Sequence, residues 1–91
     1  MLDALWFDPT EMLIGGAWVS ASSTLPLTNP SDGSHLADIA RGTAADIDAA
    51  VTAAHSARAG DWGRLSATER GRILTRIGQQ VLDRVDALAM I

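Results

Sequence analysis

The sequence contains no cysteine, no lysine and no tyrosine. Without cysteine the chain cannot form a disulfide, supply a thiolate metal ligand or provide a thiol nucleophile. All seven basic residues are arginine and the formal net charge is −4, so there is no polycationic run to neutralise nucleic-acid phosphates or an anionic membrane surface. We therefore expect no thiol chemistry and no nucleic-acid partner.

Long apolar runs are also missing. The longest extend over a few residues, far fewer than the roughly 20 that cross a bilayer. The first residues, MLDALWFDPTEM, carry three acidic side chains and no basic one, which is the wrong charge for a secretion signal or a transit peptide. These absences predict no membrane contact and a cytoplasmic setting.

The most informative stretch that is present runs from Ser66 to Ala89. Ser66 and Glu69 form a capping box, in which each side chain accepts from the other residue's backbone N–H, and this predicts a helix start. Large apolar residues then recur at spacings of three and four and share one stripe: Ile73, Leu74, Ile77, Val81, Val85 and Leu88. The pattern predicts one long helix, or two helices end to end, over residues 66–89.

The N-terminal residues show no clear period. Asp8-Pro9 favours a turn or an extended dipeptide, and we expect residues 1–11 to form a flexible arm. From Met12 two short apolar runs flank Gly15-Gly16. A Gly-Gly pair can adopt positive φ at both central turn positions, so a tight β-hairpin is predicted.

A second hairpin is predicted further along the chain. After a loop at Ser20–Thr24, the strand Leu25–Thr28 leads into the turn formers Asn29–Gly33, and His35–Ala40 forms the return strand. Pro26 removes a backbone donor, so its strand should lie at an edge or beside a bulge.

A first helix is predicted from Ala44 to Arg58. Thr43 and Asp46 have capping-box spacing, and the buried face of the helix is mostly alanine. Gly60 should end the helix, and Asp61–Gly63 should form a short linker that holds Trp62 beneath the helices. An alanine face allows close approach but removes little apolar area from water.

No residue is predicted to be catalytic, to bind a cofactor or to ligate a metal. His35 and His55 lie on different elements without metal-ligand spacing. Gly15-Gly16 lacks the G-x-G-x-x-G spacing and the following helix of a dinucleotide site. Helix capping accounts for both Glu69 and Asp46, which removes the need for a general-base role.

Four blocks nevertheless resemble, in order and spacing, the N-terminal segment of the NAD(P)-dependent aldehyde dehydrogenase family. The blocks are Leu-Ile-Gly-Gly-x-Trp-Val (13–19), Thr-Asn-Pro-x-x-Gly (28–33), Gly-Thr-Ala-Ala-Asp-Ile-Asp-x-Ala-Val-x-Ala-Ala (42–54) and Trp-x-x-Leu-Ser-x-x-Glu-Arg-x-x-Ile-Leu (62–74). No block is specific alone, but four blocks in register make a strong match, which covers Leu13 to Ala89.

The resemblance implies an α/β parent with a Rossmann-type cofactor domain. Residues 12–91 would be the truncated N-terminal part of that domain, an α+β fragment with two short β-hairpins followed by two or three helices. The parent would be an oxidoreductase that oxidises an aldehyde to a carboxylic acid with NAD or NADP. In that family a Cys attacks the carbonyl, hydride passes to the nicotinamide, and a Glu-activated water hydrolyses the thioester.

None of those groups lies in this chain, so we expect it to bind no cofactor and to be inactive alone. The hairpins and the alanine-rich helix offer too little surface to bury the stripe. The stripe is therefore expected to pair with the remainder of the dehydrogenase, with a like subunit or with itself.

Two alternatives come from other classes of protein. One is a free-standing interaction module that self-associates, or pairs with a full-length dehydrogenase subunit, through the helix at residues 66–89. The other is a helical structural protein without enzymatic ancestry, which the four blocks in register disfavour. The DNA downstream would separate truncation from a free module. The aldehyde, the choice of NAD or NADP, and a translation start at Met1 or Met12 stay open.

Overall fold

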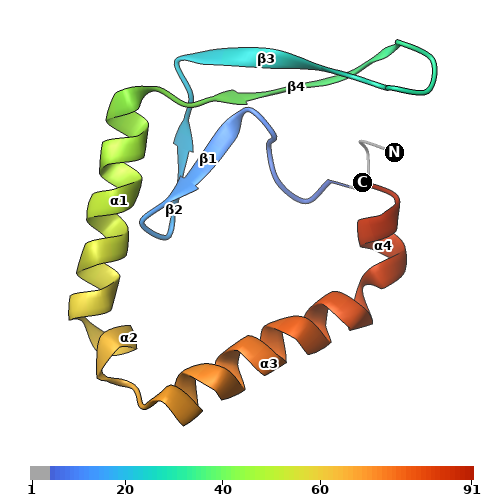
Figure 1. Ribbon diagram of the computed structural model, residues 1–91. Coiled ribbons are helices and arrows are strands. Elements are labelled where there is room, and N and C mark those ends of the chain that lie inside the picture. Colours follow the sequence, from blue (N-terminus) through green and yellow to red (C-terminus); the bar gives the residue numbers. More distant parts are fainter. Residues whose placement is uncertain (1–4) are drawn as a thin grey trace.

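The computed structural model describes residues 5–91 and consists of two antiparallel hairpins followed by four helices (Figure 1). The strands are β1 (Glu11–Ile14), β2 (Ala17–Ser20), β3 (Ser23–Thr28) and β4 (His35–Arg41). The helices are α1 (Ala44–Ala59), α2 (Asp61–Arg64), α3 (Ala67–Asp83) and α4 (Val85–Ala89). This confirms the α+β arrangement, with more helices than the two or three expected.

The β1–β2 hairpin turns at the predicted glycine pair. Gly15 and Gly16 have φ of 62° and 78°, the left-handed values that a two-residue hairpin turn needs. The preceding segment is tied to the strands, because Pro9 accepts a hydrogen bond from the Ala40 N–H at 2.8 Å and Thr10 accepts one from Ala21 at 3.4 Å. Of the expected arm, residues 1–4 lie outside the described residues, whereas Glu11 is part of β1.

The β3–β4 hairpin contains the irregularity that Pro26 predicted. The strand register shifts between Leu27 and Thr28, and a two-stranded sheet leaves both strands at an edge. The expected loop at Ser20–Thr24 was too long, because Ser23 and Thr24 already pair with β4. The sequence around Ser23 and Thr24 did not indicate this pairing, because their partners are residues of β4 at the far end of the hairpin, Arg41 and Ala40.

Helices α1 and α3 begin at the two predicted capping boxes. The Thr43 N–H donates to Asp46 Oδ2 at 2.8 Å, and the Ser66 N–H donates to Glu69 Oε2 at 2.7 Å. The reverse bonds, from the N–H of each acidic residue to the hydroxyl of the cap, are also present. Gly60 ends α1, as predicted, and its N–H donates to the carbonyl groups of the last turn.

The expected linker at Asp61–Gly63 is instead the one-turn helix α2. Asp61 Oδ1 accepts a hydrogen bond from Arg64 Nη1 at 2.9 Å, which links the ends of this turn. A Cβ at Gly63 would overlap the backbone carbonyl of Arg58. The turn therefore lies directly against the end of α1, and only glycine fits at this contact.

The stretch at residues 66–89 forms two helices, which confirms the second of the two sequence-based options. The break is at Arg84, where φ is −118° and ψ is 22°. Helix α3 occupies Ala67–Asp83 and α4 continues from Val85.

The elements follow one another around an open ring and do not pack into layers (Figure 1). The radius of gyration is 16.5 Å, whereas a compact chain of this length would have about 12 Å. The chain exposes 7,052 Å², about 2,000 Å² more than a compact protein of its mass. It therefore buries only about half of its unfolded surface, less than the 60–65% expected of a small domain. No residue from 5 to 91 is fully buried.

Candidate functional site

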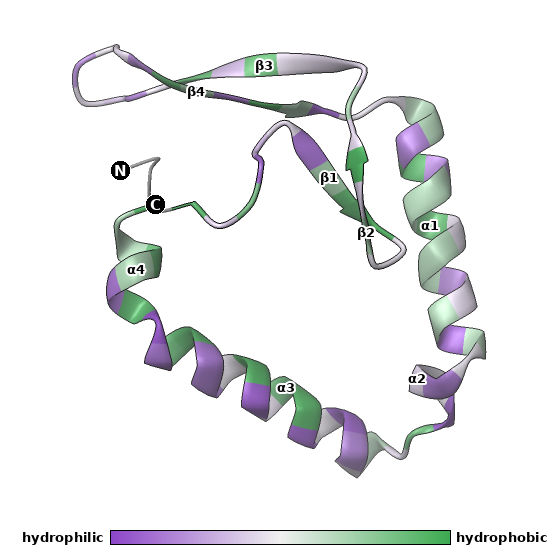
Figure 2. Ribbon diagram, turned by 180° about the vertical axis from the view of Figure 1, so that it is seen from behind, coloured by the Kyte–Doolittle hydropathy of each residue, from purple (hydrophilic) through white to green (hydrophobic). Residues whose placement is uncertain are grey.

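The apolar stripe of α3 and α4 is largely uncovered. Leu74 is 59% exposed, Ile77 52% and Val81 50%, so these side chains contribute little of the 1.5–3 kcal/mol or so that full burial would supply for each. Figure 2 shows hydrophobic and hydrophilic residues alternating along both helices, as an amphipathic surface requires.

Part of this stripe forms the wall of a shallow groove of about 710 Å³. The groove combines one N-terminal aromatic side chain with residues of α3, α4 and the C-terminal end: Trp6, Ile77, Gln80, Val81, Arg84, Ala87, Leu88 and Ile91. Its lining is mainly apolar and includes a single charged side chain, that of Arg84. The chemistry available here is therefore apolar docking with one positive charge.

The alanine face of α1 behaves differently, because it already has a neighbour. Ala50 and Ala53 line a hollow of about 380 Å³ together with the β1–β2 turn. The Ala53 Cβ lies 3.6 Å from the position that a Cβ on Gly15 would occupy. Small residues on both elements thus permit the close approach that the sequence predicted for this face.

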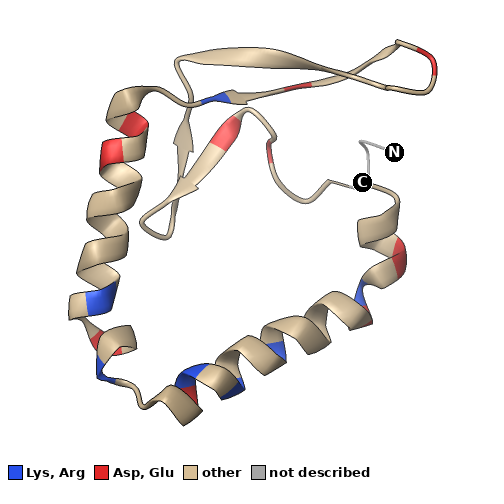
Figure 3. Ribbon diagram, viewed as in Figure 1, with Lys and Arg blue, Asp and Glu red and all other residues tan. Residues whose placement is uncertain are grey.

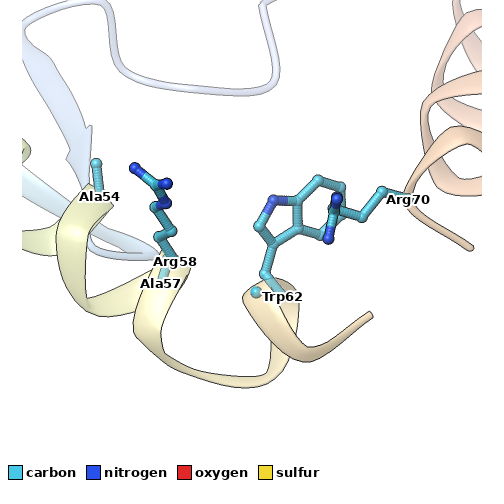
Figure 4. Close-up of a pocket in the computed structure, with 6 residues that line it drawn as sticks. Ala54, Ala57, Arg58, Trp62 and Arg70 are labelled. Carbon is cyan, nitrogen blue, oxygen red and sulfur yellow. The ribbon is translucent and has the colours of Figure 1, made fainter. Parts of the chain in front are cut away.

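The corner between α1 and α3 brings two arginines around one indole ring. Trp62 of α2 lies between Arg58 and Arg70, and the three help to line a hollow of about 610 Å³ (Figure 4). Arg70 Nη1 also donates to the Leu65 carbonyl at 2.5 Å. Trp62 lies at the helix junction, as expected, but remains 39% exposed. Figure 3 shows basic positions gathered around this corner.

The polar residues that were weighed as possible ligands or bases have local roles. His35 Nε2 lies 3.0 Å from Asp38 Oδ1 within β4, while His55 lies on α1. Over residues 5–91 no three potential ligands come together as a metal site. The carboxylates of Asp46 and Glu69 cap α1 and α3, which confirms capping as their structural role.

The described residues also do not fit a dinucleotide. Gly15-Gly16 connects two strands, whereas a dinucleotide loop leads from a strand into a helix N-terminus. The N-termini of the two long helices are occupied by Asp46 and Glu69. A pyrophosphate approaching either of them would meet a carboxylate, so no part of a hydride-transfer reaction can be derived from these residues.

Among residues 5–91, no helix combines the length and the apolar character that crossing a bilayer demands.

The features that the described residues offer are surfaces, and comparisons with known proteins show which family presents them. A family model described as "Aldehyde dehydrogenase family" matches residues 18–91. The chain belongs to the aldehyde dehydrogenase family. The match includes three of the four sequence blocks and starts within the first, at Trp18.

Its relatives within this family are much longer proteins. The chain is 40% identical over 86 residues to phenylacetaldehyde dehydrogenase of Pseudomonas fluorescens, covering 91% of the chain and 17% of the relative. It is 37% identical to cytosolic 10-formyltetrahydrofolate dehydrogenase of Pongo abelii, again covering 91% of the chain but 10% of that protein. A coverage of 91% necessarily includes residues that precede Trp18. The chain therefore spans between a tenth and a sixth of the length of these curated relatives.

A solved structure shows the same arrangement inside a larger protein. The crystal structure of an aldehyde dehydrogenase from Burkholderia cenocepacia is 49% identical to the chain and superposes with a TM-score of 0.82. The superposition covers 87% of the chain and 17% of the dehydrogenase. Most of the described arrangement is therefore also found, in that crystal structure, within a much longer chain.

Proposed function

We propose that these residues are the N-terminal structural segment of an oxidoreductase that converts an aldehyde to a carboxylic acid with NAD or NADP. The segment would form part of the cofactor-binding domain from Met12 onward, and would itself contribute no nucleophile, base or dinucleotide contact. Its role is to supply folded surface against which the rest of the protein packs.

The observation that carries this proposal is the uncovered stripe, in a conformation that is also found within a much longer dehydrogenase chain. The excess surface of about 2,000 Å² is more than the roughly 800 Å² that one partner buries in a standard protein–protein interface. The Burkholderia cenocepacia dehydrogenase is 49% identical to the chain and superposes with a TM-score of 0.82. This similarity supports the proposal that the stripe packs against the rest of a dehydrogenase here as well.

A free-standing interaction module is the second candidate, and the same stripe favours it. In that case the chain would act alone, and would form a discrete complex with itself or with a complete dehydrogenase subunit. The two candidates differ in whether the segment must be joined to a dehydrogenase body to fold fully.

A chimera separates them. The N-terminal segment of the Burkholderia cenocepacia dehydrogenase that aligns with the chain is replaced by these 91 residues. The chimera should fold and reduce NAD or NADP with simple aldehydes, whereas the isolated chain should give no signal above a buffer blank. NAD(P)H production by the isolated chain, or a chimera that does not fold, would contradict the proposal.

Ile77→Asp tests whether the stripe is the docking surface. In the chimera it should lower stability by about 2–5 kcal/mol, as for other losses of a large buried side chain, and reduce activity in parallel. Thr75→Asp is the matched control, since it introduces the same residue on the opposite side of the exposed helix and should change stability by less than about 0.5 kcal/mol. Equal effects of the two variants would rule out the stripe as the docking surface.

A further inference from the structure

The stripe carries charge of one sign at a regular spacing. Arg70, Ile77 and Arg84 follow one another at intervals of seven residues, as do Leu74, Val81 and Leu88. Seven residues are nearly two helical turns, so the members of each set that belong to α3 share one face. The helix breaks at Arg84, but Arg84 and Leu88 line the same groove as Ile77 and Val81, which keeps them on that side of the chain.

The acidic residues nearest to Arg84 in the chain, Asp83 and Asp86, form no ion pair with it. Glu69 is bound to the Ser66 N–H, and Asp83 Oδ1 accepts from Gln79 Nε2 at 2.9 Å. Within residues 5–91 no carboxylate forms an ion pair with Arg84. An occupant that covers the groove would therefore enclose a guanidinium group that needs an acceptor.

A second copy of the chain is a poor occupant for this reason. In a parallel pair in register, Arg70 and Arg84 would each face their own counterparts. In an antiparallel pair centred on Ile77, Arg70 of each copy would face Arg84 of the other copy. Both arrangements cover the whole stripe and bring like charges together, which disfavours association. An off-centre antiparallel pair avoids this contact but covers only part of the stripe.

We propose that the stripe docks an apolar face that is not a copy of itself and that places a carboxylate against the guanidinium of Arg84. The inference rests on the proposed function, in which this face belongs to the body of the dehydrogenase. Arginine binds a carboxylate through two parallel hydrogen bonds, so the pair would set the position of the segment along the groove as well as strengthen its docking.

The test reverses the charge at Arg84, which follows the last residue of α3, and compares it with the same reversal at Arg72 within α3. The 91-residue chain is titrated into the Burkholderia cenocepacia dehydrogenase lacking its aligned segment, and the dissociation constant is measured by calorimetry. Arg84→Glu should weaken binding at least about tenfold. Arg72→Glu makes the same charge change at an exposed position of α3 that does not line the groove, and should alter binding by less than about threefold.

Thermal midpoints of the corresponding chimeras give the same comparison if the shortened dehydrogenase does not fold. Arg84→Glu should lower the midpoint clearly more than Arg72→Glu. Arg84→Lys, which keeps the charge but loses the paired hydrogen bonds, should fall between the native chimera and Arg84→Glu.

The possible failures can be told apart. If Ile77→Asp abolishes binding while Arg84→Glu behaves like Arg72→Glu, docking through the stripe stands and the carboxylate pairing is wrong. If the native chain neither binds the shortened dehydrogenase nor forms a folded chimera, the proposed function fails and the inference fails with it. If the isolated chain sediments as a dimer that Arg84→Glu tightens, a second copy is the occupant and the inference is overturned.

Discussion

Helices α1 and α3 start in the same way but meet their surroundings differently. They contain 16 and 17 residues, and each begins at a capping box that closes with an acidic side chain. The face of α1 is rich in alanine and approaches the β1–β2 turn, whereas α3 presents large aliphatic residues to solvent (Figure 2). Equivalent local signals thus produce one helix with a neighbour inside the chain and one without.

The comparison shows what each kind of face needs. Small residues let α1 come close to a glycine-containing turn, although they remove little apolar area from water. The larger residues of α3 would contribute far more if buried, but the two hairpins and α1 do not reach them. The stability of α3 should therefore depend on its own cap and on an external surface, while α1 also draws on β1.

The largest effect in the isolated chain is expected at the corner that joins the two helices. Gly63→Ala would place a methyl group on the Arg58 carbonyl, and the backbone must move to relieve this overlap. We expect a loss of about 1–3 kcal/mol, as for other overpacked contacts, measured by urea unfolding followed by circular dichroism.

Gly78→Ala is the control for this substitution. Nothing lies within 4 Å of the position its Cβ would occupy on α3. Replacing glycine in a helix interior should stabilise by about 0.5–1 kcal/mol. If both variants shift the unfolding midpoint in the same direction, the close contact at Gly63 does not hold the corner in solution.

A smaller effect should separate the two capping boxes. Thr43→Ala and Ser66→Ala each remove a cap that contributes about 0.5–2 kcal/mol. Because α1 packs against β1 whereas α3 has described neighbours mainly at its ends, Ser66→Ala should lose more far-UV helix signal than Thr43→Ala. An unchanged helix signal in Ser66→Ala would mean that Glu69 has another role and would reopen its candidacy as a base.

Features set by neighbouring residues could be predicted from the sequence. The Gly15-Gly16 turn, the helix starts at Thr43 and Ser66 and the helix end at Gly60 all follow from conformational freedom or from a hydrogen bond within a few residues. The absence of a reacting thiol follows from composition alone. The family could also be inferred from the sequence, because each of the four blocks is a short run of neighbouring residues.

Features that depend on distant contacts could not be predicted. Helix α2 forms where Gly63 meets the Arg58 carbonyl, and a sequence pattern cannot show that approach. The early start of β3 depends on pairing with Arg41, far along the chain. Two helices end to end were one of the two options predicted for residues 66–89. The position of the break at Arg84 could not be predicted, because the spacing of the apolar residues continues through it. The pairing of Arg84 is not visible in any pattern, since its proposed acceptor lies on another surface.

The smallest expected effect concerns two aspartates in the strand half of the chain. The Ser34 hydroxyl and N–H both donate to Asp32 Oδ1, at 2.7 and 2.9 Å, and they lower the pKa of Asp32. Thr10 acts in the same way on Asp8, with distances of 2.6 and 2.9 Å, and lowers the pKa of that carboxyl. Each pair spans only two residues, so these bonds should form whether or not the α3 stripe is covered.

Ser34→Ala removes the stronger of the two donors to Asp32, and the pKa of Asp32 should rise towards the ordinary value of about 3.9. A carboxyl whose folded pKa is lowered stabilises the fold above that ordinary value, and the contribution is lost as the pH falls through the folded pKa. Ser34→Ala should therefore remove part of this contribution above about pH 5, and the stability of the β3–β4 turn should fall less steeply as the pH is lowered through the carboxyl range. Carboxyl NMR titration measures both sites at once, with Asp8 as the internal control. An Asp32 pKa that stays as low without the hydroxyl would show that the backbone N–H alone holds this turn.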